Sequence, residues 1–204
     1  MGGKEPLTIE EVLDFLNSQN TLRHIDKVVK TFQRSIPGTT PPVYVPIRPR
    51  ADSIENDCFE NVRRQMAEAG GDIVHGWRIY DCPGLFLEAE FHAVWKAPDG
   101  RLVDVSPPPE KGTERIVFFP DPMRTFEDEP VLSRRWPLVQ MRELREYFKA
   151  TDEHQLALRE SARRNGIGFN EPIDRSDPAL AASKQRLVAA TLALAAALSR
   201  RGPA

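Results

Sequence analysis

Alternation of hydrophobic and polar positions is clearest over residues 85–95, which read LFLEAEFHAVW. Alternate positions of a strand face opposite sides of a sheet, and here one of the two sets is wholly apolar. His92 belongs to the other set, together with Glu88 and Glu90. The pattern therefore predicts a strand with one core face, and it places His92 beside two carboxylates on the face that is not core.

The residues that follow this strand predict the register of its partner. Residues 97–101 (APDGR) are typical of a three-residue hairpin loop, with proline at the first turn position and glycine at the left-handed position. Such a loop pairs position 95 with 103 and places Asp104 diagonal to His92 on the same face. Diagonal neighbours lie roughly 7–8 Å apart, a gap that long side chains can cross. We therefore predict a His92–Asp104 pair.

Apolar residues at helical spacing predict helices on both sides of this region. Thr8 and Glu11 form a capping box for the first helix, and Asp57 and Glu60 form another for a helix that begins at Cys58. Gly70-Gly71 should end the helix that begins at Cys58, and Asp177 can cap a helix from Pro178 onward. The remaining helices are expected at 21–34, 139–149 and 153–164. The expected strands are 73–80, 85–95, 101–105 and 115–119.

One helix followed by an antiparallel sheet is an α+β pattern. We expect the helix that begins at Cys58 to pack on a small antiparallel β-sheet, flanked by N- and C-terminal helices. The expected segments are an N-terminal helical pair (1–35), a proline-rich connector (36–50), a central core (51–122) and a C-terminal helical extension (123–204) packed on the core as one domain.

Composition limits the classes of partner. The chain has 204 residues, a net charge of −2 and 40% hydrophobic residues, which is ordinary for a soluble protein. So weak a charge favours neither nucleic acid nor an anionic membrane as partner. The N-terminus does not resemble a signal peptide, and the most apolar run, 187–198, is too short to cross a bilayer. We therefore expect a cytoplasmic protein whose Cys58 and Cys82 are thiols and not a disulfide.

Cys58, His92 and Asp104 form a candidate catalytic triad. Cys58 stands at the first turn of its helix, where the macrodipole and free N–H groups stabilise a thiolate. A thiol nucleophile needs a base, and the base needs a carboxylate that fixes its tautomer. The Cys58 backbone N–H is one candidate oxyanion donor. The other candidate site residues, as oxyanion donors or pocket residues, are Asn56, Asn61, Trp77, Glu88 and Glu90.

At these residues the chain resembles the transglutaminase-like branch of the papain-like cysteine enzymes. Those enzymes carry a Cys at a helix N-terminus, then a His on a strand and an Asp on the next strand. The separations of 34 positions (58 to 92) and 12 positions (92 to 104) match the compact spacing of that branch. Gly76-Trp77, 92–95 (HAVW) and 104–107 (DVSP) also look like its motifs. Residues 58–62 (CFENV) are similar to those of protein N-terminal glutamine amidohydrolases.

This resemblance implies a function for the central core at 51–122. Cys58 would be the nucleophile, His92 the base and Asp104 the orienting residue of a hydrolase or acyl transferase. The substrate would be a protein, a peptide or a small amide, including glutamine and asparagine side chains, attacked through a thioester. No cofactor and no metal are expected.

Two other interpretations stay open. The acidic residues around Cys58 favour a catalytically inactive scaffold that serves as a binding or interaction domain. A small structural metal-binding domain is the second alternative, and its candidate ligands are His75, Cys82, Glu88, Glu90 and His92. The apolar stripe of the last helix can pack within the fold or can form a homo-oligomer interface.

Overall fold

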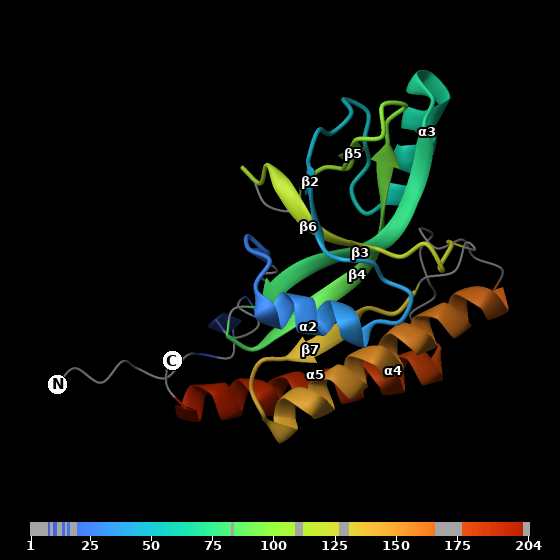
Figure 1. Cartoon of the computed structure of the whole chain (residues 1–204). Coiled ribbons are helices and arrows are strands. Elements are labelled where there is room, and N and C mark those ends of the chain that lie inside the picture. Colours follow the sequence, from blue (N-terminus) through green and yellow to red (C-terminus); the bar gives the residue numbers. More distant parts are fainter. Residues whose placement is uncertain are drawn as a thin grey trace. The chain divides into compact units, whose positions relative to one another are not determined.

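The computed structural model describes residues 20–82, 84–108, 112–126, 131–165 and 177–201, with positions 8, 10, 11, 14 and 16. The fold is α+β, as expected, with helices and an antiparallel sheet (Figure 1). The chain divides into two compact units. One comprises Met1–Gln19, Gly84–Phe86 and Glu127–Ala204, and the other, called the sheet unit below, comprises Asn20–Pro83 and Leu87–Phe126.

The strands of the sheet unit are hydrogen-bonded in the order β2-β6-β3-β4-β5, and β1 pairs with β3. Their bounds are β1 Asn20–Thr21, β2 Val43–Pro46, β3 Asp72–Cys82, β4 Phe86–Lys96, β5 Leu102–Val103 and β6 Arg115–Pro120. The two longest strands, β3 and β4, run side by side in the middle of this order (Figure 1). Each of the four strands expected from the sequence therefore has a counterpart in the sheet.

The two edge strands of this sheet meet at Asp104. Its N–H donates to the Pro46 carbonyl at 2.9 Å, and its carbonyl accepts the Arg48 N–H at 2.8 Å. Ile47 and Asp104 form a parallel bridge. Proline cannot donate a ladder hydrogen bond, but its carbonyl can still accept one. The sheet therefore closes on itself, and the segment 36–50, expected to be a connector, supplies one of its strands.

The β4–β5 hairpin has the register that the turn residues predict. Trp95 pairs with Val103, and the Ala97 N–H donates to the Arg101 carbonyl at 2.8 Å. Gly100 has a φ of +86°, the left-handed conformation that glycine adopts without strain. Turn chemistry alone was thus sufficient to fix which residues of the two strands face each other.

β4 is buried on both faces, which the sequence did not predict. Ala93 packs against α3 (Cys58–Ala69) in one apolar cluster. Val94, on the opposite face, belongs to a second apolar cluster. The other fully buried members of these clusters are Val62 in the first, and Val45, Ile116 and Phe118 in the second. The expectation that His92 lies on a face that is not core is wrong, because only 5% of its surface is exposed.

The helices of the sheet unit begin and end at identifiable signals. Asp26 caps α2 (Lys27–Ser35), so this helix begins six residues later than expected, after the short strand β1. α3 begins at Cys58 and ends at Ala69, where Gly70, with a φ of +70°, is the C-terminal cap. The expected capping box of α3 is wrong, because the Asp57 side chain makes no capping hydrogen bond.

The other unit contains α4 (Arg142–Asn165), α5 (Pro178–Arg201) and β7 (Arg134–Pro137). α4 and α5 lie side by side (Figure 1). α4 is one continuous helix where two were expected, while Asp177 caps α5 as the sequence indicates, accepting the Ala179 N–H at 2.9 Å. None of the described helices combines the length and the apolar composition needed to cross a membrane.

Candidate active site

The side chains of His92 and Asp104 are in direct contact, as the hairpin register predicts. Nε2 of His92 lies 3.0 Å from Oδ2 of Asp104. The other carboxylate oxygen accepts the Ser106 N–H at 3.0 Å. Asp104 is fully buried, so this carboxylate depends on protein partners for all of its solvation. Its two oxygens are thereby held in one orientation toward the imidazole.

Cys58 completes a contiguous set with this pair. Its side chain lies within hydrogen-bonding reach of the His92 ring. Since Nε2 is engaged by Asp104, Nδ1 is the ring nitrogen left for the thiol. The structure therefore brings together all three residues of the candidate triad, one from the start of α3, one from β4 and one just after β5.

The electrostatics of the set favour a charged imidazole. Burial lowers the pKa of His92, but the Asp104 carboxylate and the Cys58 side chain raise it more, so that the pKa lies above its ordinary value. For Asp104, burial raises the pKa, yet His92 and Arg78 together with the Ser106 N–H lower it below its usual range. The buried carboxylate of Asp104 therefore holds the imidazole beside it in its charged form.

Arg78 is a charged neighbour that the sequence analysis did not place at the site. It comes from β3, only 3% of its surface is exposed, and its Nη1 lies 3.8 Å from Oδ2 of Asp104. Its guanidinium also lies over the Tyr80 ring, 5.0 Å from the centroid. An arginine within the otherwise apolar and aromatic run 76–80 (GWRIY) was the sequence signal for a buried ion.

The expected pocket residues are scattered. Trp77 is fully buried, donates to Asp121 Oδ2 at 3.0 Å and packs edge-on against Phe91, as a core residue does. Glu90 is exposed and hydrogen-bonded to Tyr80. Glu88 is 7% exposed, and its charge helps to raise the pKa of Cys82. Trp77 is therefore part of the core and not a pocket wall.

The two candidate oxyanion residues differ sharply. Asn56 is exposed and has a φ of +60°, a left-handed conformation two residues before Cys58. Asn61 is fully buried, and its amide is engaged with Ile54 and Ser106. Asn56 and the Cys58 backbone N–H are therefore the donors left for an oxyanion.

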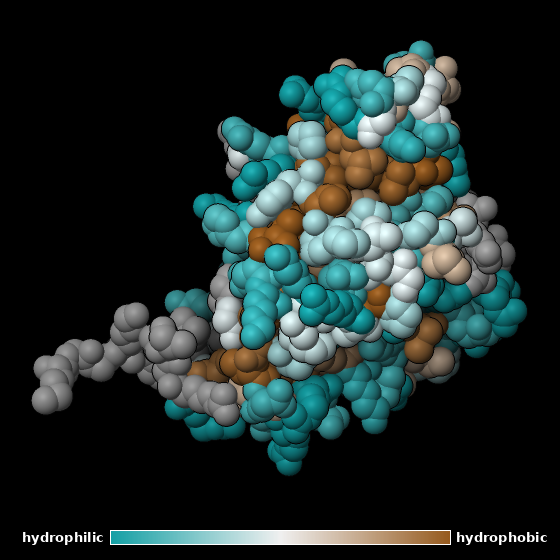
Figure 2. All heavy atoms as spheres, viewed as in Figure 1, coloured by the Kyte–Doolittle hydropathy of each residue, from teal (hydrophilic) through white to brown (hydrophobic). Residues whose placement is uncertain are grey.

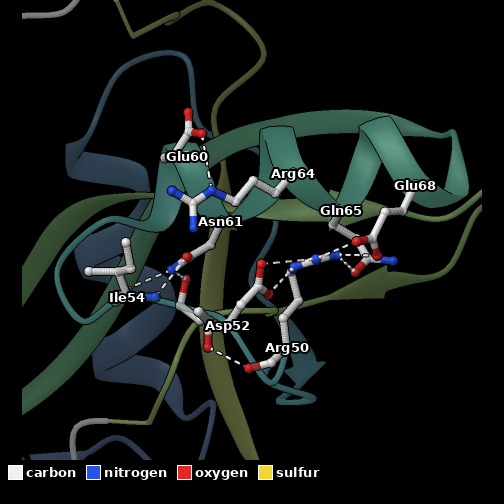
Figure 3. A network of polar contacts seen from close by, with 10 residues as sticks. Arg50, Asp52, Ile54, Glu60, Asn61, Arg64, Gln65 and Glu68 are labelled. Atoms are coloured by element: carbon white, nitrogen blue, oxygen red, sulfur yellow. Dashed lines mark hydrogen bonds and ion pairs between the residues drawn. The ribbon is translucent and has the colours of Figure 1, made fainter.

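The loop that leads into Cys58 is fastened to α3 (Figure 3). Arg50 donates to Glu68 at 2.8 Å and to Gln65 at 3.0 Å, both on α3, and to Asp52 within the loop at 2.9 Å. Only 10% of the Arg50 side chain is exposed. These bonds join the loop to the C-terminal half of α3, away from its first turn.

Aromatic side chains adjoin Cys58. Phe59, the next residue of α3, stacks on Phe126 with ring centroids 3.8 Å apart, and it also contacts His75 and Phe91. His75 is packed in this cluster, and burial lowers its pKa, with Arg63 adding to the effect. On the face shown in Figure 2, hydrophobic residues gather where β5 and α3 lie in Figure 1.

No group of three or more His, Cys, Asp or Glu side chains in the described part of the chain is arranged to hold a metal ion. The comparisons with known proteins add no relative, since no family model, no curated protein and no solved structure matches the chain. The chemistry of the site therefore has to be argued from its own residues.

Proposed function

We propose that this protein is a cysteine-dependent hydrolase or acyl transferase that acts on an amide through a thioester at Cys58. The observation that carries the proposal is the buried His92–Asp104 contact at 3.0 Å, with Cys58 near enough to the same imidazole to raise its pKa. This region also resembles transglutaminase-like and papain-like enzymes. The three residues follow one another in the order Cys, His, Asp, as in those enzymes, and Cys58 lies at a helix N-terminus.

The chemistry needs only groups present in the chain. Sγ of Cys58 attacks the carbonyl carbon, the C–S bond forms, and the C–N bond breaks. The proton held between Cys58 and His92 passes to the leaving nitrogen. Water then attacks the thioester carbonyl and gives a proton to His92, the C–S bond breaks, and His92 returns the proton to Sγ. The thiol is restored, and the result is hydrolysis or deamidation. An amine in place of water yields acyl transfer.

Two features of the first turn of α3 support this role. The Asp57 side chain makes no capping bond, so it does not occupy the N–H groups that would face an oxyanion. Glu60, one of the acidic residues that favoured an inactive scaffold, is paired with Arg64 at 3.2 Å. Its charge is thereby offset, which weakens the argument for a scaffold that only binds.

The test is the pH dependence of alkylation by iodoacetamide, read by mass spectrometry, in wild type and His92→Ala. Cys82 serves as the internal control, because burial followed by Asp81 and Glu88 raises its pKa to about 12. We expect Cys58 to be alkylated at neutral pH in wild type. In His92→Ala we expect the alkylation rate of Cys58 to fall by about tenfold or more. Equal Cys58 rates in the two proteins would show that thiol and imidazole are not coupled, and the proposal would fail in favour of a binding domain.

A further inference from the structure

Asn61 lies three residues after Cys58 on α3, and both its amide oxygen and its amide nitrogen are hydrogen-bonded. Oδ1 accepts the Ile54 N–H at 2.9 Å, and Nδ2 donates to the Ile54 carbonyl at 2.8 Å and to Ser106 Oγ at 3.3 Å. Figure 3 shows the amide facing the backbone of Ile54. An asparagine amide has two donor hydrogens and one acceptor oxygen, so no donor hydrogen is left for a substrate.

Ser106 extends this arrangement to the carboxylate of the site. It is 5% exposed, and its N–H donates to Oδ1 of Asp104, whose Oδ2 contacts His92. A contiguous series of hydrogen bonds thus runs from Asn61 through Ser106 and Asp104 to His92. It starts on the helix that carries Cys58 and ends on the ring that faces Cys58 from β4.

We propose that Asn61 is a positioning residue, which through Ser106 sets the placement of the Cys58 helix relative to the His92–Asp104 pair. The inference rests on the proposed function, because it assigns Asn61 a part in the geometry of that site. Apolar contacts of α3 with β4 are non-directional, whereas a hydrogen bond specifies distance and angle. A displacement of about 1 Å between reacting groups can cost roughly 100-fold in rate.

The test compares variants that break this series at one bond with a variant that breaks a neighbouring bond. Ser106→Ala removes only the Oγ, since the backbone N–H that binds Asp104 remains. Asn61→Ala removes the other end of the same bond and both bonds to Ile54. Gln65→Ala is the matched control, because it removes a bond between the same loop and α3 that does not lead to Asp104.

Two readouts are taken from each full-length variant. The first is the pH–rate profile of Cys58 alkylation. The alkylation rate of the buried Cys82 is measured beside it, because that rate rises if a variant destabilises the whole sheet unit. The second is the titration of the His92 ring followed by NMR. We expect the neutral-pH rate of Cys58 to fall about tenfold in Ser106→Ala and Asn61→Ala, with a displaced His92 titration, while Gln65→Ala matches wild type and Cys82 stays protected.

Unchanged Cys58 profiles and His92 titrations in Ser106→Ala would overturn the positioning role. A rise in Cys82 reactivity that parallels the change at Cys58 would also overturn it, in favour of a general structural role. If His92→Ala leaves Cys58 unaffected while Ser106→Ala still moves the His92 titration, the proposed function fails and the coupling of Asn61 to His92 stands.

Discussion

Cys58 and Cys82 lie in two regions of the sheet unit, and both side chains are largely buried, with 9% and 2% of their surface exposed. Cys58 begins α3 and faces His92. Cys82 ends β3, where burial, then Asp81 and Glu88, raise its pKa to about 12. Burial therefore does not distinguish the two thiols. What differs is the neighbouring groups, because Cys58 acts on the His92 imidazole, whereas the charges that raise the pKa of Cys82 are those of Asp81 and Glu88.

Removing the carboxylate behind His92 tests this contrast most strongly. In Asp104→Ala, His92 and Arg78 lose their shared buried anion, and we expect the free energy of unfolding in urea to fall by about 3–5 kcal/mol. Asp81→Ala is the matched change beside Cys82. Because burial raises the pKa of Asp81, its carboxylate is destabilised in the folded chain, and that variant should lose little stability. Equal losses in the two variants would contradict the contrast.

Replacing each thiol by a hydroxyl gives a smaller effect. Cys82→Ser places a hydroxyl at a 2% exposed position of β3, and an unsatisfied buried hydroxyl costs about 1–3 kcal/mol. Cys58→Ser places the hydroxyl within reach of His92, so we expect a lower cost. Chemical denaturation of both variants measures the difference. A larger loss in Cys58→Ser would mean that His92 does not receive the hydroxyl.

The smallest effect is a dependence of stability on pH that belongs to Cys82. Its pKa is raised from 9.0 to about 12 in the folded chain, so below pH 9 both states keep the proton and nothing is gained or lost. As the pH rises through 9 only the unfolded chain ionises, and stability falls by roughly 1.4 kcal/mol at pH 10. Cys82→Ala should lack this decline when the two proteins are compared at pH 8 and pH 10. A parallel decline in the variant would assign it to other groups.

The features that the sequence predicted are local ones. The hairpin register came from the turn at 97–101, and the His92–Asp104 contact followed from that register. The end of α3 followed from Gly70, and the start of the first helix followed from Thr8, whose Oγ1 accepts the Glu11 N–H at 3.2 Å. Each of these depends on residues only a few positions apart, where stereochemistry leaves few alternatives.

The features that the sequence missed are set by distant residues. β2 lies in a proline-rich stretch, and its pairing of Val45 with Ile116 joins positions far apart in the chain. The polar set of β4 indicated a face that is not core, yet closure of the sheet buries His92 with Arg78 as a charged neighbour. Asn61 was a candidate oxyanion donor because only the fold shows that Ile54 and Ser106 take up its amide.

The closure of the sheet at Asp104 restricts the conformational freedom of this residue in the folded chain. The residue is held through its N–H by Pro46 and through its carbonyl by Arg48, so its backbone is fixed on the side opposite β4 as well. A carboxylate on a free loop would lose conformational freedom each time it had to orient an imidazole. Here that freedom is lost once, when positions 47 and 104 come together during folding, so the carboxylate is already oriented toward His92 in the folded chain.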